Sequence, residues 1–116
     1  MPEPTLSTVF NLEIERCADH AVVVRCHGRL NAGVTEILQS QVHPLISESK
    51  RIILDLTDLA VMDSMGLGAI IRLYVSAKSS GCSFEMINIG KRIRQLLGFT
   101  NLLDVFTVVG EHNIRM

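Results

Sequence analysis

Three carboxylates and a serine lie close together in residues 54–68, between a predicted buried strand and a predicted helix. Asp55, Asp58 and Asp63 lead directly to Ser64. In open α/β sheets, ligands and partners usually bind at the edge where the strands end and the following helices begin. The start of a helix also offers unpaired N–H groups and a partial positive charge, which favour a phosphate. The stretch therefore predicts a site for binding or modification where the helix begins.

The same carboxylates allow a second interpretation, a phospho-aspartate or metal site of an enzyme. A receiver domain also needs an acidic pair after its first strand and a lysine after its last, and residues 26–28 and 108–110 supply neither. Gly66-Leu67-Gly68 is too short for a dinucleotide loop. The cysteines and histidines show no spacing typical of a zinc or redox site. We therefore expect no catalytic residue, metal or cofactor, and keep the enzyme as a minor alternative.

Length and composition indicate one compact domain over residues 1–116, with residues 1–8 and 111–116 as loose ends. Hydrophobic residues make up 47% of the chain and charged residues 20%, which is a globular composition. Eleven Lys and Arg oppose twelve Asp and Glu, so no excess charge attracts nucleic acid or an anionic membrane. No apolar run approaches the ~20 residues of a membrane span, and the N-terminus lacks the pattern of a signal peptide. We expect a soluble, cytoplasmic protein.

Hydrophobic periodicity predicts an α/β domain with a mixed sheet of about five strands flanked by about four helices. Alternating residues at 10–15 and a Val-rich run at 21–26 predict a hairpin that turns at Asp19-His20. A helix is expected to begin at Asn31 as its N-cap. Because Pro44 lacks an N–H and clashes with the preceding turn, we expect that helix to kink or restart near His43.

The second half of the chain alternates between predicted strands and helices. The predicted elements are a central strand at residues 51–56, a loop at 57–63, a helix at 64–79, a strand at 83–89, a helix at 91–97 that Gly98 ends, a turn at 101–104 and a last strand at 105–109.

The helix at 64–79 divides into two faces when its residues are spaced at about 100° each. The face expected to cover the sheet gathers Leu67, Ile70, Ile71, Tyr74 and Lys78. The opposite face gathers Met65, Ala69, Arg72 and Ser76, flanked by Gly68 and Leu73. A solvent-facing stripe of small and apolar groups around one arginine is typical of a protein-binding surface. An ordinary helix surface explains the same pattern equally well.

The run Asp63-Ser64-Met65-Gly66-Leu67-Gly68 resembles the D-S-[ST]-G-L-G element of STAS domains in anti-sigma factor antagonists. Gly28-Arg29-Leu30-Asn31 is similar to the family's G-x-L-D segment, residues 53–56 to its central strand, and residues 93–106 to its helix, Gly-Leu turn and final strand. The resemblance covers nearly the whole chain. It implies a STAS-type fold without catalytic activity. It also implies binding to an anti-sigma factor, often a serine kinase related to histidine-kinase ATPase domains, and thereby control of sigma-factor release.

The chain departs from the family pattern where phosphorylation switches binding off. The usual acceptor is the hydroxyl residue just before Gly66; here that residue is Met65, which cannot take a phosphate. Ser64 is retained, and some branches of the family carry their hydroxyl at this position. Either Ser64 is the acceptor, or the module binds constitutively, or Ser64 only caps the helix. Asn31 replaces the family's Asp and removes one acidic group near the site.

The expected partner-binding residues combine the family motif with the outer stripe of the helix. They are Asn31, Asp58, Asp63, Ser64, Met65, Gly66, Gly68, Ala69, Arg72 and Leu73. The expected partner is an anti-sigma factor of the serine-kinase type, and the oligomeric state is left open between a monomer and a weak dimer. STAS modules also serve as partners of ABC-type transporters and lipid-trafficking ATPases and as parts of stress-signalling scaffolds. That alternative stays open.

Overall fold

A computed structural model describes residues 10–99 and 107–109 of the chain. Its elements are β1 (Phe10–Cys17), η1 (Ala18–His20), β2 (Ala21–Leu30), η2 (Ala32–Val34), α2 (Thr35–Ile46), β3 (Arg51–Met62), α3 (Ser64–Ser79), β4 (Ser83–Ile87), α4 (Lys91–Phe99) and β5 (Thr107–Val109). The strands form one sheet in the order β1-β2-β3-β4-β5. β1 is antiparallel to β2, and the other neighbouring strands are parallel. The predicted mixed α/β fold is confirmed. The described residues hold three α-helices instead of four, and β5 spans only three residues.

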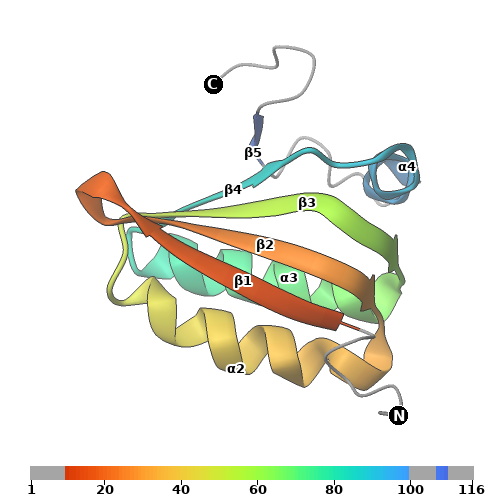
Figure 1. Ribbon diagram of the computed structural model, residues 1–116, viewed down its shortest axis with the longest axis horizontal. Helices are drawn as coiled ribbons and strands as arrows, with labels where there is room; N and C mark the ends of the chain where they lie inside the picture. The colour runs from red at the N-terminus through yellow and green to blue at the C-terminus, as the bar shows by residue number, and fades with distance from the viewer. Residues whose placement is uncertain (1–9, 100–106, 110–116) are drawn as a thin grey trace, which may run out of the picture.

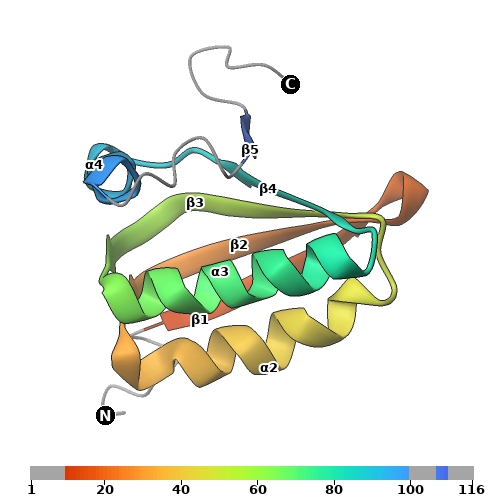
Figure 2. The same ribbon diagram turned by 180° about the vertical axis from the view of Figure 1, so that it is seen from behind.

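The helices cover the two faces of the sheet unequally. Figures 1 and 2 show α2 and α3 side by side on one face, with α4 across the sheet from them near β3 and β4. Parallel strands need crossover connections; here α2 joins β2 to β3 and α3 joins β3 to β4. Alternate strand residues are buried under these two helices: Val22, Val24, Cys26, Ile52, Leu54, Leu56, Phe84 and Met86. Each fully buried Val, Leu, Ile, Phe or Met side chain contributes about 1.5–3 kcal/mol.

The predicted hairpin of β1 and β2 is confirmed and turns through η1. Asp19 (φ 63°) and His20 (φ 60°) both adopt the left-handed region, which aspartate and histidine occupy more readily than most residues. Lys50 N donates a hydrogen bond to His20 O at 2.8 Å. The hairpin tip is therefore tied to the segment that enters β3.

The helix after β2 runs through its proline. η2 begins after Asn31, and α2 then continues without interruption to Ile46 with Pro44 inside it. The predicted restart near His43 is therefore wrong. Pro44 is exposed and only two residues from the end of α2. The distortion that a proline demands therefore falls on the outer side of the last turn.

The predicted loop at residues 57–63 is wrong, because β3 continues to Met62. It stays paired with β2 through two register shifts, one between Arg25 and His27 and one between Gly28 and Arg29. A shift of this kind inserts an unpaired residue and changes which side chains face the core. The alternating pattern that identifies a strand is therefore lost in this half of β3.

The C-terminal elements differ from the prediction at their ends. β4 stops at Ile87, two residues early, and Asn88 follows with a φ of 59°. α4 extends to Phe99 and includes Gly98, so the prediction that Gly98 ends the helix is wrong. The turn expected at 101–104 and the first two residues of the strand expected at 105–109 lie outside the described residues. β5 confirms the rest of that strand.

Candidate functional site

The start of α3 is held by the carboxylate of Asp63. Its backbone is extended (φ −101°, ψ −175°), and its Oδ1 accepts a hydrogen bond from Gly66 N at 2.8 Å. This is an N-cap, which satisfies one of the free N–H groups of the first turn. Ser64 is the first helical residue and is exposed, and its hydroxyl has no partner within the described part of the chain. The interpretation of Ser64 as the cap is therefore wrong.

A close contact between Gly66 and Leu30 fixes the start of α3 against the sheet. Leu30 ends β2, pairs with Met62, and accepts a hydrogen bond at its carbonyl from Asp63 N at 3.2 Å. A Cβ on Gly66 would lie 2.4 Å from that same carbonyl oxygen. Gly66 is also buried. It therefore positions the helix, and the expectation that it contacts a partner is wrong.

The backbone leaves the sheet at Asn31, next to the point where it leaves the sheet at Asp63. Asn31 follows Leu30 and Asp63 follows Met62, and these two preceding residues are paired across β2 and β3. Asn31 Oδ1 accepts a hydrogen bond from Gly33 N at 3.1 Å and caps η2, which confirms its predicted role as an N-cap. Asn and Asp are about equally good caps. The loss of the family's acidic group therefore leaves this turn intact.

The predicted solvent-facing stripe on α3 is wrong at Ala69 and Leu73. Both side chains are fully buried, because α2 packs along this side of α3. Gln39 of α2 also donates from Nε2 to Ala69 O at 2.8 Å. Met65 and Arg72 are exposed, as predicted.

The accessible residues at the start of α3 offer hydroxyl, apolar and cationic groups together. Met65 is 57% exposed. A Cβ added to Gly68 would lie 3.9 Å from Arg72 Nη1, so the guanidinium reaches back along the helix over an open glycine. We call the following residues the α3 entrance: Asn31, Asp63, Ser64, Met65, Gly68 and Arg72. Chemically, this surface suits an apolar protein contact next to a hydroxyl that sits at a positive helix end.

Asp58 belongs to a different surface, the outer face of the sheet. Its Oδ2 lies 3.1 Å from His27 Nδ1, and His27 Nε2 lies 3.4 Å from Glu13 Oε1. The Nε2 atom is buried and has no hydrogen-bond partner among the described residues. Its contact with Glu13 is therefore not a hydrogen bond. Asp58 is also about 16 Å from Asp63 along the strand, at ~3.3 Å per residue. The structure therefore does not bring Asp58 into the α3 entrance.

Asp55 is a structural carboxylate. Its Oδ1 accepts hydrogen bonds from Thr57 N, Thr57 Oγ1 and Asn88 Nδ2 at 3.0, 2.6 and 3.2 Å, and its Oδ2 lies 3.8 Å from Arg25 Nε. Partial burial alone would raise the pKa of Asp55. The hydrogen bonds from Thr57 and Asn88 and the charge of Arg25 outweigh burial, so the pKa lies below its ordinary value. Asp55 therefore stabilises the first register shift of β3 and is not a free acid or base.

Three exposed apolar residues were not predicted. Val75 on α3 is 54% exposed, Ile14 on β1 is 39% exposed and Val61 on β3 is 38% exposed. The outward position of Val75 follows from helical spacing once the packing of α2 is known. Val61 fell in the predicted loop, where no strand pattern was available to place it.

The described residues, 10–99 and 107–109, contain no group of three or more His, Cys, Asp or Glu arranged to hold a metal ion. The helices in these same residues are all too short or too polar to cross a membrane. Cys17 is exposed, whereas Cys26 and Cys82 are buried. Burial and the nearby charge of Asp55 raise the pKa of Cys26 to about 12, so its thiol is inert at neutral pH.

Comparisons with known proteins agree with this architecture. The chain is 24% identical over 99 residues to the anti-sigma-B factor antagonist of Bacillus subtilis (strain 168), covering 85% of this chain and 90% of the relative. It is 27% identical over 102 residues to the anti-sigma F factor antagonist of Paenibacillus polymyxa, covering 85% and 87%. The anti-sigma factor antagonist SpoIIAA in its unphosphorylated form has the same fold, with a TM-score of 0.74 at 20% identity and coverage of 87% and 90%. The family model for the STAS domain matches residues 12–113. This chain therefore belongs to the STAS domain family.

Proposed function

We propose that this chain is an anti-sigma factor antagonist, a cytoplasmic binding module and not an enzyme, whose α3 entrance binds an anti-sigma factor of the serine-kinase type. Family membership and two relatives named anti-sigma factor antagonists support the proposal. The single observation that carries the site is the exposed hydroxyl of Ser64. It has no partner in the part of the chain that the structure describes, and it directly follows the Asp63 cap.

Met65 supplies the apolar contact of this interface. More than half of its side chain is exposed, next to the open backbone at Gly68. Burying a methionine side chain fully contributes about 1.5–3 kcal/mol. Methionine is enriched in protein interfaces, and a buried contact contributes most where the surrounding residues exclude water. Met65 thus favours binding and leaves Ser64 as the hydroxyl available for regulation.

A phosphate on Ser64 switches this interface off. It adds roughly −1.5 to −2 charges at neutral pH beside the Asp63 carboxylate. The free N–H groups of the first turn and the Arg72 guanidinium, which reaches back along α3, stabilise the phosphate in the free protein. A partner that covers Met65 must then remove water from this charge. Phosphorylation therefore lowers the affinity for the partner without unfolding the helix.

The test uses the kinase-type anti-sigma factor of the same organism. The purified factor is incubated with this chain and ATP, and intact mass with fragment ions reports the number and position of phosphates. We expect one phosphate on the wild type and on Ser79→Ala, an exposed serine at the far end of α3, and none on Ser64→Ala. The phosphorylated chain should no longer co-elute with the factor.

Two outcomes would contradict parts of the proposal. Stable binding without phosphate transfer would indicate an antagonist that binds constitutively, with Ser64 outside its regulation. No binding to the factor, together with binding to an ABC-type transporter ATPase, would overturn the anti-sigma factor assignment and leave the STAS fold intact.

A further inference from the structure

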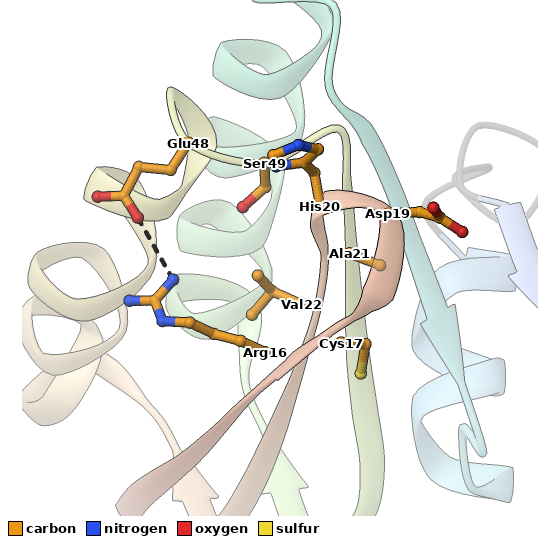
Figure 3. A pocket seen from close by; sticks show the side chains of 8 residues that line it. All are labelled: Arg16, Cys17, Asp19, His20, Ala21, Val22, Glu48 and Ser49. Carbon is orange, nitrogen blue, oxygen red and sulfur yellow. Dashed lines mark hydrogen bonds and ion pairs between the residues drawn. The ribbon is translucent and has the colours of Figure 1, made fainter.

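A hollow of about 430 Å³ lies at the end of the sheet opposite the α3 entrance. β1 ends and β2 begins there, and the segment between α2 and β3 closes one side. Its lining residues are Arg16, Cys17, Asp19, His20, Ala21, Val22, Glu48 and Ser49, shown in Figure 3. The volume falls within the range of about 300–1,000 Å³ that is typical of small-molecule sites.

Arg16 brings a cation with unused donors to this hollow. Its Nη1 donates to Glu48 Oε1 at 3.3 Å, across the mouth of the hollow in Figure 3. A guanidinium has five N–H donors, so most of them are left for a ligand. The two side chains are 63% and 57% exposed, and a pair this exposed opens at little cost.

Ser49 supplies the observation that the fold itself does not explain. Its Oγ is buried and has no hydrogen-bond partner among the described residues. Buried polar atoms almost always have a partner in the protein, in water or in a ligand. In Figure 3 this hydroxyl points into the space between Glu48 and Val22. The lining thus includes a hydroxyl that the described residues leave without a hydrogen-bond partner.

His20 and the floor of the hollow define the rest of the ligand. The backbone of His20 is fixed in the left-handed region and by the hydrogen bond from Lys50 N. His20 lines the same hollow as Ser49, and its imidazole has no partner in the described part of the chain. Ala21 and Val22 at the start of β2 give the floor apolar groups. Donors from three segments therefore surround an apolar surface.

We propose that this hollow binds a small organic oxyanion, a carboxylate or a phosphate carried on a short apolar body. A planar carboxylate or a phosphate accepts two parallel hydrogen bonds from Arg16 once Glu48 turns away. Ser49 and His20 donate to the remaining oxygens, and the apolar body lies on Val22. β3 separates this site from the α3 entrance by twelve residues, so the proposal is independent of the partner surface.

The test is a titration of the ¹⁵N-labelled full-length chain followed by amide chemical shifts. The probes are sodium phosphate, sodium acetate and sodium butyrate, and sodium chloride controls for ionic strength. We expect saturable shifts at the amides of His20, Ser49 and Lys50 with at least one oxyanion and none with chloride. If the carboxylate is the ligand, butyrate should bind about fivefold more tightly than acetate, because its added methylenes contact the apolar floor. If only phosphate saturates, phosphate is the ligand group.

Three variants test which side chains hold the anion. Arg16→Gln should weaken binding about tenfold or more and Ser49→Ala several-fold, because each removes a donor to an anion. Arg29→Gln, at the far end of β2, should bind like the wild type. Shifts that rise linearly and match those with chloride would overturn the proposal. So would saturable binding that Arg16→Gln and Ser49→Ala leave unchanged.

Discussion

Replacing Gly66 by alanine tests how the α3 entrance is held in place. The added Cβ would lie 2.4 Å from Leu30 O and 2.8 Å from Leu30 Cγ. Leu30 O is a backbone atom of β2 and also accepts the hydrogen bond from Asp63 N. The helix must therefore move away from the sheet by about 0.6 Å to reach even 3.0 Å, the closest approach that Cβ atoms normally show.

The expected change in the free energy of unfolding has three contributions, two that destabilise the fold and one that stabilises it. Overpacking of this kind costs about 1–3 kcal/mol, and weakening the hydrogen bond to Leu30 O costs about 1 kcal/mol more. Replacing glycine by alanine inside a helix returns about 1 kcal/mol. We expect Gly66→Ala to lower the free energy of unfolding by about 2 kcal/mol, which is a fall of about 1 M in the urea midpoint for a domain of this size.

Gly68 provides a matched control on the same helix. The nearest atom to its added Cβ is Arg72 Nη1 at 3.9 Å. Gly68→Ala should therefore raise the free energy of unfolding by up to about 1 kcal/mol through helix propensity alone. Urea unfolding followed by circular dichroism at the helix band measures both variants. If Gly66→Ala is as stable as Gly68→Ala, the contact between α3 and Leu30 does not position the site.

Three further predictions concern the cap, the pH dependence and the thiols. Asp63→Ala should lower the free energy of unfolding by about 1 kcal/mol, whereas Asp63→Asn should keep most of the cap; equal stability of both variants in urea would contradict the N-cap. Because the pKa of Asp55 is lowered in the folded state, its stabilisation is present above the ordinary aspartate pKa of about 3.9 and is lost as pH falls through the lower folded pKa. Asp55→Asn should therefore flatten the pH dependence of unfolding below about pH 5, and an unchanged slope would refute this role. Iodoacetamide at neutral pH should add one group, on Cys17, because Cys26 and Cys82 are buried; rapid addition of more groups to the folded chain, seen by intact mass, would contradict the core packing.

The order of elements and the start of α3 could be predicted from the sequence because both depend on local chemistry. The alternation in β1 and β2, the apolar run at the start of β3 and the Asp63-Ser64 boundary of α3 all agree with the structure. The structure also places Asn31 and Asp63, the two capping residues of the motif, beside each other at the ends of β2 and β3. These features need no information on distant contacts.

The wrong predictions share one cause: each concerns a residue whose position depends on tertiary packing. Ala69 and Leu73 lie opposite the sheet-facing residues in helical projection, yet α2 covers them, and no local pattern reveals a neighbouring helix. The motif predicts Gly66 as an open position that a partner contacts. Its contact with Leu30 depends on where β2 ends, which the motif does not show. The sequence predicts Asp58 at the site because the register shifts that keep β3 extended are not visible in the residues of β3.

The most direct test of the central claim is the affinity of two single-charge variants for the anti-sigma factor, measured by isothermal titration calorimetry. Met65→Glu and Val75→Glu place the same charge on α3 at side chains that are 57% and 54% exposed, about 15 Å apart along the helix axis. We predict that Met65→Glu weakens binding by about 100-fold or more, because a charge replaces a buried apolar contact. Val75→Glu should bind like the wild type. Equal affinity of the two variants, whether unchanged or equally reduced, would contradict the assignment of the α3 entrance as the partner-binding surface.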